Sequence, residues 1–174
     1  MKDWIDSEGK MNNYEEFYKK ISAPFRRHPS GVKGLNLMNT LLTRVVYVVY
    51  PMFLIRLIWD RDERWIACAA VPAVFFVLLS VVRNYINRPR PYETWNLLPL
   101  IHKDTRGKSM PSRHVFSAAV IAMAFLSVSL PVGIFFLIWS FLLALIRVLG
   151  GVHYPSDVLA GLLLGGLAGL LLVV

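Results

Sequence analysis

The segment GGVHYPSD, residues 150–157, separates the last two apolar stretches of the chain and carries the polar residues around which the chain is organised. It puts His153 four positions before Asp157 and six positions after Arg147. Side chains four apart share a face if the backbone is helical there. An imidazole, a carboxylate that orients it and a guanidinium that holds an anion would suit phosphoryl transfer. By itself the spacing fits a helix cap equally well.

The composition indicates an integral membrane protein. The chain has 174 residues, enough for one compact unit, and 56% of them are hydrophobic. Its mean hydropathy is +0.51, far too apolar for an ordinary soluble domain. The apolar residues form runs near the length of roughly 18 residues that crosses a bilayer. We therefore predict an all-α, polytopic membrane helix bundle with about five transmembrane spans. The expected spans are residues 35–58, 65–82, 114–130, 134–149 and 156–174.

The charge of the chain points to anionic partners. The formal net charge is +8, but the sequence has no nucleic-acid-binding motif, and its basic residues flank the apolar runs. We therefore expect the membrane bilayer and a lipid phosphate substrate as partners, and no nucleic acid. Cys68 is the only cysteine, so no intrachain disulfide can form. The sequence does not define an oligomeric state.

The first 34 residues are polar and basic, unlike the rest of the chain. Apolar residues recur among them at helical spacing, at Tyr14, Phe17, Ile21 and Phe25. This pattern is typical of an amphipathic helix at the membrane interface, although a partly ordered tail explains it equally well. The segment contains no apolar core of signal-peptide length, so we expect no cleaved leader. We divide the chain into an N-terminal interfacial segment, residues 1–34, and a transmembrane domain, residues 35–174.

Five spans would bring the two long polar segments to one side of the membrane. These are residues 83–113 and 147–157, whereas the short turns 59–64 and 131–133 would lie on the other side. Residues 83–113 are rich in arginine and lysine. A loop this long in a compact protein is usually functional or disordered. We therefore expect an active-site loop over residues 83–113, beside the second polar segment.

Two further polar clusters lie in this loop. The first consists of Arg83, Arg88, Arg90 and Pro91. Arginine presents a planar fork of donors that fits phosphate oxygens, but such residues can also simply set membrane topology. The second cluster is Ser109-Met110-Pro111-Ser112-Arg113-His114, which opens the third span, where free backbone N–H groups can bind anions. Ser112 is either an anion ligand or a plain N-cap, and His114 can donate a proton near neutral pH.

Asp157 likewise has two interpretations. It is a candidate cap for the fifth span. As a functional residue it would accept a hydrogen bond from one ring nitrogen of His153, which fixes the tautomer and leaves the other nitrogen free to attack phosphorus. Two histidines suit a two-step reaction, in which one attacks and the other protonates the leaving group.

Taken together, the clusters resemble the motifs of the type-2 phosphatidic acid phosphatase superfamily. Those motifs are lysine–six residues–arginine–proline, then proline–serine–glycine–histidine, then serine–arginine–five residues–histidine–three residues–aspartate. In this chain they read Arg83, six residues and Arg90-Pro91; then Pro111-Ser112-Arg113-His114; then Arg147, five residues, His153, three residues and Asp157. Order and spacing agree throughout, and the match covers roughly residues 80–160.

The resemblance implies a role for each matching position. His153 is similar to the nucleophile that forms a phosphohistidine, with Asp157 as its orienting partner. His114 corresponds to the general acid for the leaving group and afterwards to the base for water. The implied phosphate cradle consists of Arg83, Arg90, Ser112, Arg113 and Arg147. The resemblance implies no metal and no other cofactor, and the sequence has no acidic cluster that would hold magnesium.

Three positions depart from the family pattern. Arg83 replaces a lysine, which keeps the charge but not the shape. Arg113 replaces a glycine, so its side chain can reach a second phosphate or a headgroup. Ile146 replaces a serine and removes one possible donor. None of these changes removes the implied nucleophile or acid, so we expect activity.

We therefore predict a metal-independent lipid phosphatase acting on a phosphomonoester or a terminal diphosphate. From the family resemblance we rank undecaprenyl diphosphate as the first candidate substrate, followed by phosphatidylglycerophosphate, phosphatidic acid and a lipid A phosphate. The alternatives are a non-catalytic transporter or assembly factor with a vestigial phosphate site, and a vanadate-dependent haloperoxidase, which the apolar spans disfavour. We expect the protein in a bacterial cytoplasmic membrane with its active site facing outward, although the basic tail favours a cytoplasmic site by the positive-inside rule.

Overall fold

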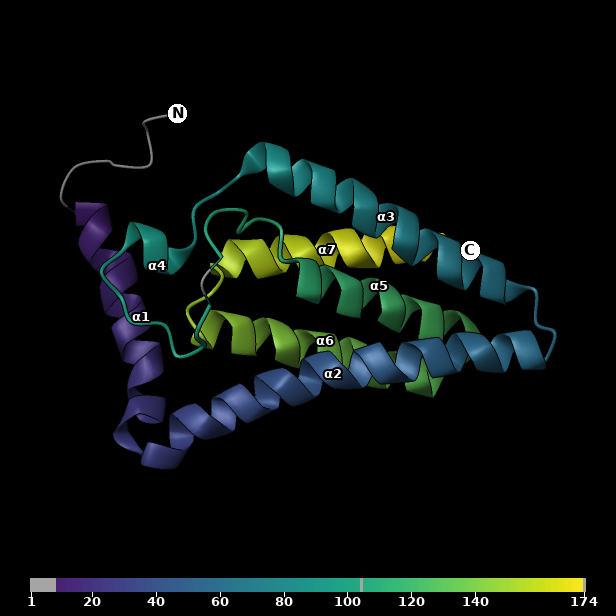
Figure 1. Ribbon diagram of the computed structural model, residues 1–174, viewed down its shortest axis with the longest axis horizontal. Coiled ribbons are helices and arrows are strands. Elements are labelled where there is room, and N and C mark those ends of the chain that lie inside the picture. Colours follow the sequence, from purple (N-terminus) through teal and green to yellow (C-terminus); the bar gives the residue numbers. More distant parts are fainter. Residues whose placement is uncertain (1–8, 104, 174) are drawn as a thin grey trace.

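The computed structural model describes residues 9–103 and 105–173, with side chains from Tyr14 onward, and these residues fold into helices joined by loops (Figure 1). The helices are α1 (Gly9–Arg27), α2 (Pro29–Trp59), α3 (Arg64–Ile86), α4 (Pro91–Thr94), α5 (Arg113–Val128), α6 (Leu130–Leu149) and α7 (Pro155–Leu170). No strand occurs within the described ranges. The prediction of an all-α helix bundle is confirmed.

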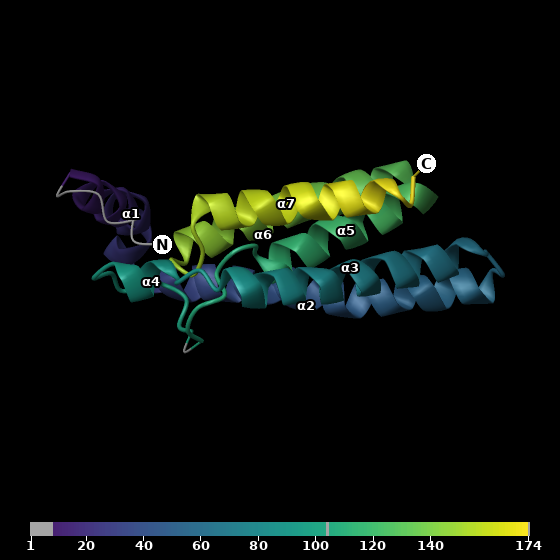
Figure 2. The same cartoon turned by 90° about the horizontal axis from the view of Figure 1, so that it is seen from above.

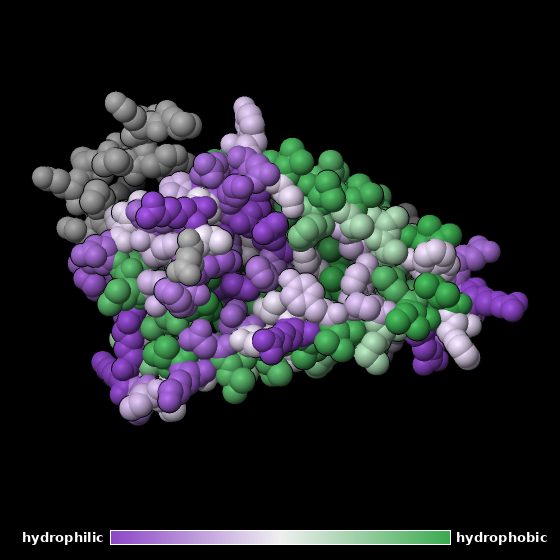
Figure 3. All heavy atoms as spheres, viewed as in Figure 1, coloured by the Kyte–Doolittle hydropathy of each residue, from purple (hydrophilic) through white to green (hydrophobic). Residues whose placement is uncertain are grey.

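The bundle has the surface of an integral membrane protein. The segments long and apolar enough to cross a membrane are Pro29–Trp59, Arg64–Thr94 and Leu130–Leu149. Helices α5 and α7 are apolar but only 16 residues long, which corresponds to about 24 Å against a hydrocarbon core of about 30 Å. Figure 3 shows hydrophilic side chains at both ends of the molecule and hydrophobic ones between them. The predicted apolar segments are thus helical, and three of them have the length of a full crossing.

Helix α5 forms the centre of the bundle. Figure 2 shows α2 and α3 in one layer and α6 and α7 in another, with α5 between them. Helix α5 packs most closely on α6 and α7 and also contacts α3. Most of its residues between Val115 and Phe125 are buried, because its sequence is apolar on every side. This central helix therefore fixes the position of His114 in its first turn.

Glycines let α7 approach α5 closely. A Cβ atom at Gly161 would lie 2.8 Å from the carbonyl oxygen of Ser112, and one at Gly165 would lie 2.7 Å from that of Phe116. Because both distances are too short for a side chain, only glycine permits this helix spacing. Gly166, by contrast, has no atom within 4 Å of an added Cβ. The close approach brings the first turns of α5 and α7 together.

The polar loops gather at one end of the bundle. Figure 1 shows α4 and the loops before α5 and α7 at the end that α1 crosses, whereas the connection between α2 and α3 lies at the opposite end. The N–H of Ser112 donates to the carbonyl oxygen of Asp157 at 2.9 Å, which joins two of these loops directly. The prediction that residues 83–113 and 147–157 share one end is therefore confirmed.

Two element boundaries differ from the sequence interpretation. Helix α2 begins at Pro29, so residues 29–34 belong to the first long helix, because proline fits the first helical position, where no N–H donor is needed. Only Ser129 separates α5 from α6. Pro131 therefore lies in the first turn of α6 and not in a loop over residues 131–133.

Helix α1 is present as predicted, but it contacts the bundle through a different face. Tyr18 and Ser22, which lie between the apolar positions of the sequence pattern, are its buried residues, whereas the side chain of Phe17 is 42% exposed. The hydroxyl of Tyr18 accepts a hydrogen bond from the N–H of Leu100 at 3.2 Å. Helix α1 is thus attached to the loop that follows α4.

Candidate active site

Three arginines from distant parts of the chain are buried at the loop end of the bundle. Arg83 lies in the last turn of α3, Arg90 precedes α4, and Arg147 lies in the last turn of α6. The chain can turn between the first two because Asn87 ends α3 in a left-handed conformation, with φ of 41°. A buried guanidinium needs partners or an anion, so this end of the molecule is suited to phosphate.

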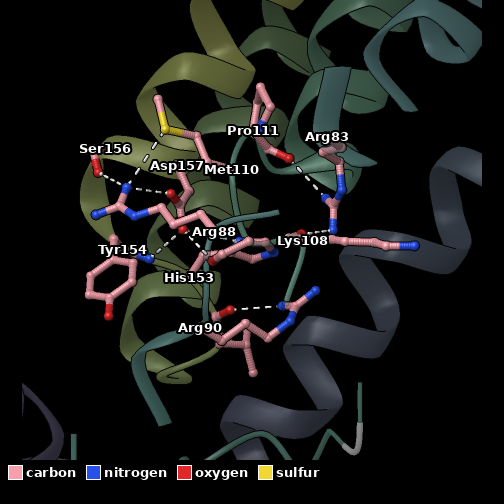
Figure 4. Close-up of polar contacts among 12 residues, drawn as sticks. Arg83, Arg88, Arg90, Lys108, Met110, Pro111, His153, Tyr154, Ser156 and Asp157 are labelled. Atoms are coloured by element: carbon pink, nitrogen blue, oxygen red, sulfur yellow. Dashed lines mark hydrogen bonds and ion pairs between the residues drawn. The ribbon is translucent and has the colours of Figure 1, made fainter. Parts of the chain in front are cut away.

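Arg83 and Arg90 hold the active-site loop as well as contributing charge (Figure 4). Arg83 donates from Nη1 to the carbonyl oxygen of Pro111 at 2.8 Å and from Nη2 to that of Lys108. Arg90 donates from Nη1 to the carbonyl oxygen of Val152 at 2.9 Å and from Nε to that of Gly107 at 3.2 Å. Both residues therefore use some of their N–H donors to bind backbone carbonyl groups around the site. The sequence motif did not predict these contacts.

His153 and Asp157 face each other at the start of α7. Both are fully buried, and Nδ1 of His153 lies 3.5 Å from Oδ2 of Asp157. The hydroxyl of Ser109 bridges them, since it donates to Oδ2 of Asp157 at 2.5 Å and lies 3.4 Å from Nδ1 of His153. The same Oδ2 atom accepts the N–H of Tyr154 at 2.9 Å, as a helix cap would. Asp157 therefore combines the two interpretations of the sequence, because it caps α7 and faces the histidine.

The surroundings of His153 keep its imidazole neutral. Burial lowers the pKa of His153 to about 4, because it penalises the charged form, and the positive charges of Arg90 and Arg147 act in the same direction. The contact with Asp157 raises the pKa but does not offset the burial. A neutral imidazole with Nδ1 turned toward a carboxylate leaves Nε2 as the basic nitrogen. This is the state that a nucleophilic histidine requires.

Two buried polar groups at the site lack a hydrogen-bond partner among the described residues. They are the hydroxyl of Ser112 and Nε of Arg147. Buried polar atoms are nearly always paired in folded proteins, so an unpaired donor marks a place where a ligand can bind. Both groups belong to the cradle that the family resemblance implies, and both come from elements packed around His153.

The remaining two predicted residues lie at the rim. His114 is half-buried, and the charges of Arg147, Lys103 and His153 act on it, so the two histidines are near each other. Arg113 is exposed, with its guanidinium carbon 5.7 Å from the centre of the Phe76 ring on α3. The structure thus brings the two histidines and the buried arginines together, and it leaves Arg113 at the edge of the cluster.

Lys103 in the active-site loop was not singled out from the sequence. Burial lowers its pKa to about 7. The charges that lower it further belong to Arg90, Arg147, Arg83 and Arg113. A half-buried lysine within electrostatic range of four arginines adds to a strongly positive site. Only the folded structure reveals this, because the loop carries several similar basic residues.

Arg88 and Ser109 were part of the sequence clusters but received no role of their own. In the structure both bind the carboxylate of Asp157: Arg88 donates to Oδ1 (Figure 4), and the hydroxyl of Ser109 donates to Oδ2. Within the described residues, no three histidine, cysteine, aspartate or glutamate side chains are placed to hold a metal ion.

An oriented, neutral histidine among buried arginines, at the end of a membrane helix bundle, defines a membrane-embedded phosphatase. The chain belongs to the PAP2 superfamily, whose family model matches residues 63–174, more than half of its length. It is accordingly a lipid phosphatase, and the resemblance drawn from its three motifs is confirmed.

Two solved structures are similar to this protein over most of their length. Aquifex aeolicus LpxE shares 26% sequence identity with a TM-score of 0.72, and the match covers 90% of this chain and 92% of that one. A transmembrane PAP2-type phosphatidylglycerolphosphate phosphatase from Bacillus subtilis shares 24% identity with a TM-score of 0.71, covering 92% of this chain and 85% of that one. At 24% identity, the similarity to the Bacillus subtilis structure shows a shared fold alone.

Proposed function

We propose that the protein hydrolyses the terminal phosphate of a lipid through a phosphohistidine on His153. The observation that carries this proposal is the buried, neutral His153, whose Nδ1 faces Asp157 and whose charge state is influenced by the buried Arg90 and Arg147. Undecaprenyl diphosphate is our first candidate substrate, followed by phosphatidylglycerophosphate and phosphatidic acid. The proposed reaction uses no metal ion.

The reaction has two displacements at phosphorus. In the first, Nε2 of His153 forms a bond to phosphorus while the bond to the leaving oxygen breaks, and His114 transfers a proton to that oxygen. In the second, His114 accepts a proton from water, the water oxygen bonds to phosphorus, and the phosphorus–nitrogen bond breaks to release inorganic phosphate. Asp157 stabilises the positive charge that develops on the ring of His153.

The charge of the site favours a headgroup with more than one phosphate. The proposed cradle consists of Arg83, Arg90, Ser112, Arg113 and Arg147, and Lys103 adds a further cation to it. Guanidinium groups of this kind stabilise phosphate oxygens as negative charge shifts during transfer. A diphosphate neutralises more of this positive charge than a monophosphate does. This is our reason, beyond the family ranking, for placing undecaprenyl diphosphate first.

A hollow beside His114 supports a lipid as the leaving group. It lies between α2, α5 and α6, and its lining is mainly apolar. Its lining residues are Leu42, Thr43, Val46, Tyr47, His114, Ser117, Ala118, Ile121 and Leu143. Because His114 would protonate the leaving oxygen, the first carbons of the lipid chain must lie close to it. The hollow has room for about one water-sized group, so its apolar side chains would contact those carbons without enclosing the chain.

Purified protein in detergent tests this function. We expect phosphate release from at least one candidate lipid in the presence of a chelator, and its loss in His153→Ala and His114→Ala. Acid-labile phosphate should accumulate on His153 in rapidly quenched reactions. Phosphate release that needs magnesium, or that survives His153→Ala undiminished, would remove the mechanism. Absence of release from every lipid would favour the alternative of a transporter or assembly factor with a vestigial site.

We further propose that residues 1–34 lie at the membrane interface and that residues 35–174 form the transmembrane phosphatase domain, in a bacterial cytoplasmic membrane with the site facing outward. Arg106→Cys, exposed in the active-site loop, should be labelled by an impermeant thiol reagent on intact cells. Arg61→Cys, exposed at the other end, serves as the matched control and should not be labelled. The reverse pattern would place the site in the cytoplasm.

A further inference from the structure

The carboxylate of Asp157 is bound on both of its oxygens. Oδ2 accepts hydrogen bonds from the N–H of Tyr154 and the hydroxyl of Ser109, and it faces Nδ1 of His153. Oδ1 receives Nη1 of Arg88 at 2.8 Å. A fully buried carboxylate is costly unless it is paired with a cation and hydrogen-bonded. Since the ring of His153 is neutral, the cation paired with Asp157 is Arg88.

Arg88 is itself held in a fixed orientation. Its Nη1 also donates to the hydroxyl of Ser156 at 2.8 Å and contacts the sulfur of Met110 at 3.7 Å. Its guanidinium carbon lies 4.2 Å from the centre of the Tyr154 ring, a stacking distance that favours a cation on an aromatic face. Only 23% of the side chain is exposed. Arg88 is therefore held by Asp157, Ser156, Met110 and the Tyr154 ring together (Figure 4).

We propose that Arg88 is a positioning residue, which holds the carboxylate of Asp157 ionised and turned so that Oδ2 faces His153. The inference rests on the proposed role of His153 as nucleophile. Arg88 acts through Asp157 and needs no contact with the substrate. Ser109 completes the arrangement, because its hydroxyl donates a hydrogen bond to Oδ2.

If Arg88 is replaced by a neutral residue, we expect His153 and Asp157 together to keep one proton up to a higher pH. Without the guanidinium, the buried negative charge of Asp157 must be compensated by a proton, either on its own oxygen or on the imidazole. An opposite charge at this range changes carboxylate pKa values by about 1 to 3 pH units. A histidine that keeps its proton cannot attack phosphorus, so the defect should be largest at low pH and should diminish as the pH rises.

Other charged groups around the pair remain in place when Arg88 is replaced. Those that act on His153 or Asp157 from neighbouring elements are Arg90 before α4, Arg147 in α6, Arg83 in α3, His114 in α5, and the hydroxyls of Tyr14 and Tyr154. Among these groups the arginines favour the neutral imidazole of His153, as in the wild-type protein. Replacing Arg88 should therefore remove only the cation that pairs with Asp157 and leave the other charges around the pair as they are.

The test measures the protonation of His153 directly. Hydrogen–deuterium exchange at C2 of each histidine ring, followed by mass spectrometry, gives a midpoint for His153 in the full-length protein in detergent. In Arg88→Gln we expect this midpoint to rise by roughly one pH unit or more. Arg61→Gln is the matched control, since it removes the same charge at the opposite end of the bundle and should leave the midpoint unchanged.

This measurement does not depend on activity, so it separates the inference from the proposed function. An unchanged midpoint in folded Arg88→Gln overturns the role of Arg88, even if the enzyme is active. Absence of phosphate release by the wild-type protein overturns the proposed function, whatever the midpoint shows. Should Arg88→Gln not fold, Arg88→Met, which fills a similar volume against Met110 and Tyr154, decides in the same way.

Steady-state kinetics provide the second readout. With farnesyl diphosphate, a short-chain prenyl diphosphate, kcat of Arg88→Gln should fall about twofold or more at pH 5 and less at pH 9, with KM within twofold of the wild type. Arg88→Lys, which keeps the charge, should recover part of the pH profile. A rise in KM larger than the fall in kcat would mean that Arg88 binds substrate, which would contradict a positioning role.

Discussion

Replacing Gly165 by alanine tests whether the spacing between α5 and α7 sets the geometry of the site. The added Cβ would lie 2.7 Å from the carbonyl oxygen of Phe116 and 2.7 Å from Cβ of Ala119. Backbone cannot turn aside as a flexible side chain can, so α7 must move outward. Overpacking of this kind costs about 1–3 kcal/mol, whereas alanine gains only about 0.5–1 kcal/mol over glycine in a helix. The free energy of unfolding should therefore fall.

The same displacement should reduce activity, because α5 carries His114 and α7 follows directly on His153. A shift of about 1 Å between reacting groups can lower a rate about 100-fold. We expect Gly165→Ala to lower kcat at least tenfold and to lower the thermal midpoint in detergent by a few degrees, at about 2–4 °C per kcal/mol for a chain of this size.

Gly166→Ala is the matched control for this prediction. Its Cβ would meet no atom within 4 Å, so it should keep wild-type activity and have an equal or slightly higher thermal midpoint. The two variants differ only in the face of α7 that carries the methyl group. If Gly165→Ala behaved like Gly166→Ala in both assays, close helix approach would not be what positions the two histidines.

Three further predictions follow from the same structure. The pKa of His153 is lowered in the folded state, so the unfolded chain binds a proton first as the pH falls. The free energy of unfolding should therefore fall between about pH 6.5 and pH 4, by up to roughly 3 kcal/mol. Thermal unfolding of His153→Ala over this range should show a smaller loss. KM should rise above pH 7 as Lys103 loses its charge, and Lys103→Met, assayed from pH 6 to 9, should abolish that rise. Tyr18→Phe should lower the free energy of unfolding by no more than about 1 kcal/mol in thermal melts, because the N–H of Leu100 keeps its bond to Gly150.

The sequence predicts the placement of the site well because two kinds of constraint act together. Apolar runs of bilayer length fix where helices lie, and their number then decides which polar segments share an end. His153 and Asp157 face each other although His153 lies just before α7, so the turn that begins the helix brings them together and not helical periodicity.

Contacts between loops could not be predicted in this way. Arg83 binds carbonyl groups of the loop before α5, and the register of that loop depends on the fold and not on any periodicity. Arg88 looked like the other arginines around it, because nothing in a count of spacings separates a carboxylate partner from a phosphate ligand. Helix α1 gave a similar difficulty. Tyr18 and Ser22 are buried, although neither belongs to the apolar pattern from which an interfacial helix was predicted.

The single residue between α5 and α6 has a consequence for how the chain is made. From His114 to Ile146 the sequence contains no aspartate, glutamate, lysine or arginine, and Arg113 and Arg147 bound this stretch. With only Ser129 between the two helices, no polar connection is available to be carried across the bilayer on its own. We therefore expect α5 and α6 to enter the membrane together as a helical hairpin. Both bounding arginines then stay on the side from which the hairpin entered, whichever side that is.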